Sequence, residues 1–144
     1  MSDVSDLAAD ASIDRFARAA LGRKARGLVL LDVRELTSVA DAFLICSGQS
    51  NRQVSAIGEH IITELKKKKI KPLSTEGLKE GHWVLIDYGY VVIHIFYEPI
   101  REFYDLEGLW IDAPRVITPG MAAAAAPETQ QKGGRTCQAQ PPLP

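Results

Sequence analysis

The residues of this sequence that could support chemistry are three histidines, two cysteines and a few carboxylates in apolar segments. His60, His82 and His94 lack the close spacing of a helical or hairpin metal site, and no cysteine lies within a few residues of any of them. Cys46 stands in an apolar run and Cys137 in a segment rich in proline, glutamine and glycine, so the two form neither a disulfide framework nor a metal-spaced pair. We therefore expect reduced thiols, no metal and no cofactor.

A Ser-Gly-Gln-Ser turn at residues 47–50 could hold a phosphate, because it ends an apolar run and opens a helical one. It lacks the lysine of a P-loop and the spaced glycines of a dinucleotide fingerprint. A nucleotidyltransferase would also need two metal-holding carboxylates on the next strand, where the sequence reads PLST. Asp32 and Asp87 could pair only if their strands were neighbours. The sequence favours a protein that is not an enzyme; the rival is an enzyme that binds a nucleoside triphosphate near Gly48.

The elements that would position these residues alternate between helix and strand. We expect a helix at residues 12–24, strands at 27–33 and 42–47, a helix from residue 50 to the lysines at 66–69, and an edge strand at 72–75. Ser12 is the expected N-cap of the first helix, and Ser50 with Gln53 forms a capping box for the second. The four lysines suit the carbonyl end of that helix, which favours a solvated terminus over a nucleic-acid site.

Residues 82–97, HWVLIDYGYVVIHIFY, predict a tight β-hairpin with Tyr88-Gly89 as its loop. That loop pairs Asp87 with Tyr90, Leu85 with Val92 and Trp83 with His94. Alternation of side chains then gives two different faces. One face is aliphatic and suits packing under helices; it carries Val84, Ile86, Val91, Ile93 and Ile95. The other mixes aromatic and polar groups; it carries Trp83, Leu85, Asp87, Tyr90, Val92, His94 and Phe96.

The mixed face is poor core material, because Asp87 and His94 would need buried partners, and it is typical of a protein-binding surface. The alternative is that another element, such as the C-terminal segment, covers it.

Residues 101–114 predict an extended lead-in and a short helix capped by Asp105. Residues 72–114 contain eight acidic and two basic side chains, which gives this segment a formal charge of −6. This half should attract a basic protein more readily than bare RNA.

The domain boundaries follow from composition. We expect a flexible N-terminus at residues 1–11, one folded domain at 12–114 and a disordered low-complexity tail at 115–144, where few apolar side chains could offset the cost of ordering. The acidic start is unlike a targeting peptide, and no apolar run approaches a membrane span of roughly 18 residues. We therefore expect a cytoplasmic protein.

Three segments in this order resemble the ribosomal silencing factor family, also called RsfS or Iojap: LVLLDVRELTSVADAFLICSGQSNRQVSAIGEHI, EGHWVLIDYGYVVIHIF and REFYDLEGLW. The resemblance runs from about Ile13 to Pro114. It implies an α/β fold with a mixed central sheet of about five strands flanked by helices, nucleotidyltransferase-like without the catalytic carboxylates. It also implies binding to the large ribosomal subunit through its fourteenth ribosomal protein in the universal numbering, a block to small-subunit joining that represses translation, and a homodimer.

Combining the mixed face with the motifs of this family gives an expected partner-binding site. Trp83 and Tyr88 are the expected aromatic anchors. The other expected contacts are carboxylates that meet basic groups and residues that complete the patch: Asp87, Glu102, Asp105, Leu85, His94, Tyr104 and Trp110. The alternatives are that Tyr88 only shapes the turn and that Trp110 packs the last helix onto the sheet. The runner-up function is a binding module for another basic protein or structured RNA, using the hairpin and the lysines at 66–69.

Overall fold

A computed structural model describes residues 7–125, and within them the chain forms a six-stranded sheet in the order β3-β4-β5-β2-β1-β6. The strands are β1 (Arg26–Asp32), β2 (Ala42–Gly48), β3 (Ser74–Glu76), β4 (Trp83–Asp87), β5 (Val91–Tyr97) and β6 (Arg115–Val116). β2 and β5 are parallel and the other neighbours are antiparallel. The expected fold class, a mixed sheet flanked by helices, is confirmed, with six strands instead of about five.

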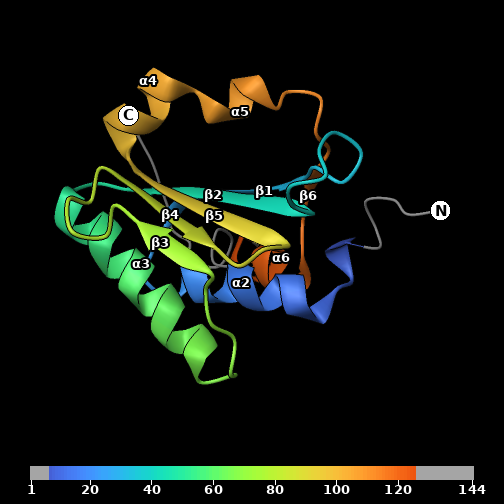
Figure 1. Ribbon diagram of the computed structural model, residues 1–144, viewed down its shortest axis with the longest axis horizontal. Helices are drawn as coiled ribbons and strands as arrows, with labels where there is room; N and C mark the ends of the chain where they lie inside the picture. Colours follow the sequence, from blue (N-terminus) through green and yellow to red (C-terminus); the bar gives the residue numbers. More distant parts are fainter. Residues whose placement is uncertain (1–6, 126–144) are drawn as a thin grey trace, which may run out of the picture.

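Helices lie on both faces of the sheet, as Figure 1 shows. They are α2 (Ala11–Leu21), α3 (Asn51–Lys66), α4 (Glu98–Tyr104), α5 (Leu106–Leu109) and α6 (Pro119–Ala125). One face carries α2, α3 and α6, and the other carries α4 and α5. Because both faces are covered, every residue of β2 is buried, which explains its continuous apolar run. None of the helices among residues 7–125 has the length and apolarity needed to cross a bilayer.

The second long helix begins where the capping box predicts, and the first does not. The Ser50 hydroxyl accepts the Gln53 amide at 3.0 Å, which caps α3. The N-cap of α2 is Asp10, whose carboxylate accepts the Ser12 amide at 2.8 Å. The Ser12 hydroxyl is therefore free of the helix end and hydrogen-bonds the Tyr90 hydroxyl at 2.6 Å. Aspartate and serine cap equally well, so spacing alone could not choose between them.

The hairpin of β4 and β5 has the predicted faces but a different register. Leu85 pairs with His94 and not with Val92, and the Tyr88 amide donates to the Val91 carbonyl at 2.9 Å. The loop is therefore Gly89-Tyr90. The physical reason is that Gly89 has a φ of +92°, which the first position of a tight type II′ loop requires. Each partner moves by two residues, so the residues within the two strands keep their predicted faces. Tyr90 does not, because as a loop residue it packs against α2 with its ring 5.8 Å from that of Phe16, and its predicted place on the mixed face is wrong.

Replacing Gly89 with alanine should destabilise the protein by about 1 kcal/mol, because an L-residue at this positive φ is strained. A Cβ there would meet only Leu73, at 3.4 Å, so the cost is conformational and not steric. Asn tolerates left-handed backbone better, and Gly89→Asn should lose less. Urea unfolding measures both variants, and equal stability of wild type and Gly89→Ala would contradict the loop assignment.

The folded domain extends beyond the predicted boundary at Pro114. β6 pairs with β1, and Val116 is 1% exposed. α6 follows and packs beside α2, where the Gly120 amide donates to the Asp14 carboxylate at 2.9 Å. The expected disordered tail is therefore wrong for residues 115–125, because two short apolar anchors order a segment of low-complexity composition. At the other end Leu7 is already buried. Residues 1–6 and 126–144 lie outside the described part of the chain.

Candidate partner-binding surface

The segment between β5 and β6 folds as two short helices over the mixed face of the hairpin. Pro99 lies in the first turn of α4, where a missing amide hydrogen costs nothing. Asp105 ends α4 in left-handed backbone, with a φ of +47°, and its carboxylate accepts the Gly108 amide at 3.2 Å to begin α5. The predicted cap at Asp105 is confirmed. The extended lead-in is wrong, because residues 98–104 are helical.

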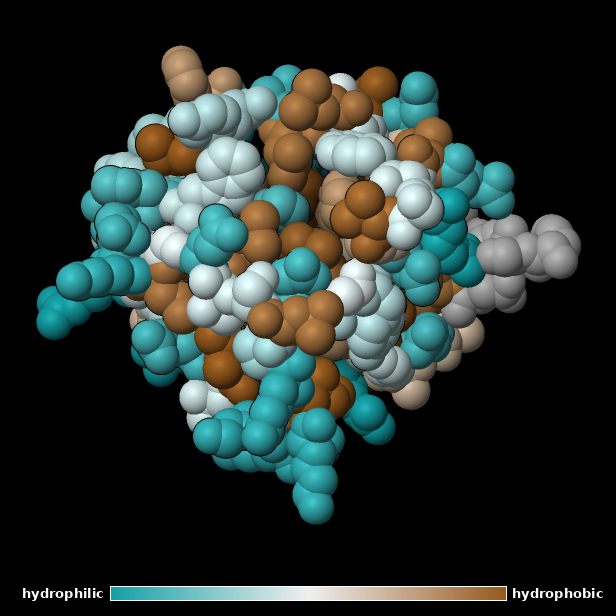
Figure 2. Space-filling view, viewed as in Figure 1, coloured by the Kyte–Doolittle hydropathy of each residue, from teal (hydrophilic) through white to brown (hydrophobic). Residues whose placement is uncertain are grey.

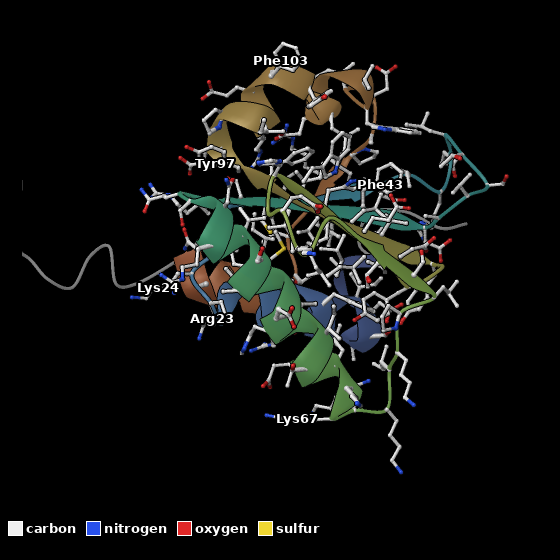
Figure 3. The ribbon with its side chains drawn as sticks, turned by 60° about the vertical axis from the view of Figure 1, so that its left-hand side comes forward. Arg23, Lys24, Phe43, Lys67, Tyr97 and Phe103 are labelled. Atoms are coloured by element: carbon white, nitrogen blue, oxygen red, sulfur yellow. The ribbon has the colours of Figure 1, made fainter. Side chains whose placement is uncertain are left out.

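These two helices cover the β5 half of the mixed face, so the alternative raised by the sequence applies there. His94 is 6% exposed and Phe96 is fully buried. Phe43 of β2 stands between the sheet and the α4–α5 layer (Figure 3), with its ring 5.0 Å from that of Trp110. Trp110 therefore packs α5 onto the sheet, which is the alternative given for it above, and no partner is needed to explain its burial. On β4, Trp83, Leu85 and Asp87 remain half-buried.

Trp83 is held in place from three sides. Its indole Nε1 donates to the Nδ1 atom of His94 at 3.1 Å. Its ring centroid lies 4.8 Å from that of Phe96 and 5.1 Å from that of Tyr104. Burial lowers the pKa of His94 to about 4, which keeps the imidazole neutral and its Nδ1 able to accept the bond. His94 thus positions Trp83 from below and does not itself reach the surface.

Arg101 fixes α4 and α5 to the sheet, a role that the sequence did not reveal. Its guanidinium donates two hydrogen bonds, of 3.0 and 3.1 Å, to the Glu107 carboxylate. It also donates to the Gly27 carbonyl at 2.8 Å and the Ser47 hydroxyl at 3.1 Å, both at the end of the β1–β2 pair. The side chain is 15% exposed. One indication of this role was present in the sequence, because Arg101 is the single arginine in a strongly acidic segment. It did not show which acidic residue Arg101 contacts.

The expected carboxylates differ in what they already contact. Asp87 accepts the Gly89 amide at 2.8 Å and so shapes the hairpin turn. Asp105 caps α5, while Glu102 is exposed on α4. Glu107 is bound by Arg101, and the hydrogen bonds from that guanidinium lower the pKa of its carboxyl group. Glu102 is therefore the expected acid that α4 presents most openly.

Tyr88 lies in the core and not on the expected surface. Its side chain is 6% exposed, with its ring centroid 4.9 Å from that of Phe16 in α2. It shares a face with Val84 and Ile86, opposite to Trp83. Burial raises the pKa of its hydroxyl to about 12. An anchor role for Tyr88 is therefore wrong, because with the corrected loop Tyr88 follows β4 directly and pairs with Val91 through its amide.

Three large side chains on α4 and α5 face solvent: Tyr104, which was an expected contact, and Phe103 and Leu109, which were not among the expected site residues. Phe103 is 79% exposed, Tyr104 51% and Leu109 76%. Figure 3 shows Phe103 pointing away from the body of the molecule, and Figure 2 shows hydrophobic residues interspersed with polar ones over these helices. A hollow lined by Glu76, Gly77, Trp83 and Leu85 opens on the same side. We call the following residues the α4–α5 surface: Trp83, Leu85, Glu102, Phe103, Tyr104, Asp105 and Leu109.

The groups considered for catalysis are separated or already bonded. Asp32 lies on β1 and Asp87 on β4, with β5 and β2 between them, so they cannot form a carboxylate pair. Arg34 binds the Asp32 carboxylate at 2.6 Å and lowers its pKa. Burial raises the pKa of Cys46 to about 12, so this thiol is not a nucleophile. Among residues 7–125 no cluster of three potential metal ligands occurs. Cys137 lies outside that range.

Comparisons with known proteins give a matching family, relatives whose names refer to the ribosome and a solved structure of the same fold. The chain matches the family described as "Ribosomal silencing factor during starvation" over residues 6–140. It is 42% identical over 92 residues to ribosomal silencing factor RsfS of Bacillus subtilis (strain 168), covering 64% of this chain and 78% of that protein. A crystal structure from Bacillus halodurans matches with a TM-score of 0.66 at 35% identity, covering 73% of this chain and 95% of that one. The mouse protein named "Mitochondrial assembly of ribosomal large subunit protein 1" is 32% identical over 89 residues, covering 60% of this chain and 39% of that protein.

Proposed function

This chain belongs to the ribosomal silencing factor family, and we propose that it binds the large ribosomal subunit and blocks joining of the small subunit. The family description and the name of the mouse relative, which refers to the ribosomal large subunit, support this proposal. The proposed contact is the fourteenth ribosomal protein in the universal numbering, as the sequence resemblance implies. We place this repressor in the cytoplasm and propose that it acts by binding, without cofactor or catalysis.

The observation that carries the proposal is the exposure of two aromatic side chains beside carboxylates on α4. Phe103 is 79% and Tyr104 51% exposed, and Glu102 precedes them on the same helix. Aromatic side chains supply much of the energy of protein interfaces, while carboxylates around them favour a basic partner. Ribosomal proteins contact RNA and are rich in lysine and arginine, so the α4–α5 surface complements them in charge.

The structure of α4 also favours binding without rearrangement. Arg101 ties the helix to β1 and β2, and Trp83 supports Tyr104 from the sheet. A surface that is already ordered loses little conformational entropy on binding, so more of the contact energy appears as affinity. Once docked, a folded domain excludes the small subunit by its volume, so no chemical step is required.

Co-sedimentation with separated subunits tests this function. The wild-type protein should comigrate with the large subunit, not with the small one, and should reduce the yield of joined ribosomes. The variant Glu102→Gln/Phe103→Ser removes one carboxylate and one exposed apolar side chain from α4. It should bind the large subunit about tenfold more weakly or worse, because it removes an exposed aromatic side chain and an attraction for a basic partner together.

A matched control makes the same two types of substitution on the opposite side of the sheet. Glu59→Gln/Ile117→Ser also removes one exposed carboxylate and one exposed apolar side chain, and it should bind like wild type. Circular dichroism should show both variants folded. Absence of wild-type protein from the large-subunit fraction would refute the ribosomal function, and equal weakening of the two variants would refute the α4–α5 surface. The implied homodimer stays a prediction, which analytical ultracentrifugation of the free protein tests.

A further inference from the structure

Among residues 7–125, most basic side chains lie on or next to α2 and α3, on the side of the sheet opposite to the α4–α5 surface. Residues 7–71 carry twelve basic and seven acidic side chains, a formal charge of +5 against −6 for residues 72–114. Figure 3 shows Arg23 and Lys24 near the start of α3 and Lys67 at its far end, with Phe103 beyond the sheet. The hairpin and the lysines at 66–69 therefore cannot form the single surface that the runner-up function required.

A groove runs between α2 and α3 on this basic side. It consists of two adjoining hollows that share Gly22, where a Cβ would stand 2.7 Å from the Nε2 atom of His60. Six cationic side chains line the groove: Arg15, Arg18, Arg23, Lys24, Arg52 and Lys68. The single acid among the lining residues is Glu64, whose carboxylate Lys67 binds at 2.9 Å. The groove is therefore strongly positive.

Five of the six cations are available to a ligand. Three of them, Arg23, Lys24 and Arg52, line the hollow near the start of α3, whose lining contains no acidic side chain. All five, including Arg15 and Lys68, are exposed, and within residues 7–125 none of them forms an ion pair. Arg18, by contrast, pairs with Asp14. Exposed cations without counter-charges retain their attraction for phosphate groups. The end of the groove near the start of α3 is thus its most attractive part for an anion.

The details of the groove favour a polyanion over a single nucleotide. The amides of Gln49 and Gln53, at the start of α3, are already bonded to the Gln53 side chain at 2.7 Å and to Ser50 at 3.0 Å. They do not form the open amide cradle that holds a nucleotide phosphate. The lining has no Phe, Tyr or Trp on which a base could stack. The groove can therefore recognise only the negative charges that are spread along a polyanion chain.

We propose that the α2–α3 groove binds the phosphate backbone of RNA without reading its sequence. Phosphate contacts position a protein on a nucleic acid, while base contacts provide specificity, and this groove offers only the first kind. The proposal does not rest on the ribosomal function, because any RNA strand supplies the ligand. Since the groove and the α4–α5 surface lie on opposite sides of the sheet, the protein can hold RNA and a basic protein at the same time.

Fluorescence anisotropy with labelled single-stranded RNA of about 15 nucleotides, a length matched to known binding-site sizes, tests the proposal. Two RNAs of unrelated sequence should bind the full chain with equal affinity. Binding should weaken steeply with salt, with a slope near −0.7 in log K against log salt for each phosphate contacted. The variant Arg23→Glu/Arg52→Glu should lose at least about tenfold in affinity, because it reverses two of the three cations near the start of α3.

The matched control is Lys71→Glu/Lys79→Glu, which changes the net charge equally at exposed positions outside the groove. It should lose far less affinity than the groove variant. Equal loss in both variants would overturn the groove as the site, and absence of RNA binding at low salt would overturn the proposal entirely. Tighter binding of a polyglutamate peptide than of RNA would also overturn it, because the groove would then fit an acidic protein.

Discussion

Acidification from pH 6.5 to pH 4 should reduce the free energy of unfolding by about 3 kcal/mol through His94 alone, at 1.36 kcal/mol for each unit of pKa difference. Burial lowers the pKa of His94 from 6.5 to about 4 in the folded protein. In this pH window the unfolded chain therefore binds a proton that the folded protein does not, so stability rises with pH. The contribution of neutral His94 is complete above 6.5 and is lost as the pH falls toward 4. Urea unfolding at several pH values across the window measures the slope.

The control for this prediction is His94→Gln, which removes the titration and keeps an acceptor for the Trp83 indole. Its stability should change much less between pH 6.5 and 4.5. The carboxylates of Asp14, Asp32 and Glu107 also have pKa values lowered from their ordinary 3.8 and 4.5, so their stabilisation begins to be lost at the acidic end of the window, equally in wild type and variant. A wild-type stability that is constant across the window, or an equal slope in the variant, would contradict the burial of a neutral His94.

The same histidine shows how far a sequence pattern determines a sheet. Alternation assigned every strand residue of the hairpin to its correct face, because side chains on a strand point to opposite sides in turn. The exact pairing depended on which backbone position Gly89 occupies in the loop. Moving the loop by one residue changed each partner by two and left the faces unchanged. The faces were therefore predictable, and the pairing of Leu85 with His94 was not.

The covering of the mixed face could not be read from the sequence, because it depends on contacts between distant segments. Arg101 meets the carbonyl of Gly27 and the hydroxyl of Ser47 only after the sheet has formed. The sequence placed Trp83, Leu85, Glu102, Tyr104 and Asp105 on a shared surface. The structure brings Trp83 against Tyr104 and beside Leu85, and it puts Glu102 and Asp105 along a separate hollow next to Arg101. It missed Phe103 and Leu109, because exposed apolar residues on short helices have no periodicity to identify them.

The errors at Tyr88 and at the C-terminal boundary have local causes. Tyr88 next to a glycine was read as a turn residue, whereas one more paired position sends it into the core beside Phe16. Residues 115–125 have the composition of a tail, yet β6 adds two residues to the edge of the sheet and Met121 is buried. A pairing of two residues is too short to give a strand pattern, so only the structure reveals it.

Replacing Arg101 with alanine should lower the free energy of unfolding by about 2–3 kcal/mol and weaken large-subunit binding. A buried ion pair that loses one partner costs about 3–5 kcal/mol, and partial exposure reduces this figure. Arg101 is 15% and Glu107 21% exposed, and the carbonyl of Gly27 loses a donor as well. Because α4 carries Phe103 and Tyr104, loosening it adds an ordering cost to docking. Urea unfolding and co-sedimentation measure the two effects.

A second ion pair between the same two parts of the chain provides the control. Arg26 of β1 contacts Glu98 of α4 at 3.3 Å, with both side chains at least 40% exposed. Exposed pairs contribute at most about 1 kcal/mol, so Arg26→Ala should have little effect. Arg101→Lys should restore little, because an ammonium cannot form the two-pronged contact. Adding Glu107→Gln to Arg101→Ala should recover part of the stability, because without Arg101 the Glu107 carboxylate keeps only its 3.8 Å contact with Arg115. If Arg101→Ala lowered the free energy of unfolding no more than Arg26→Ala does, the Arg101–Glu107 contact would not be what orders the α4–α5 surface.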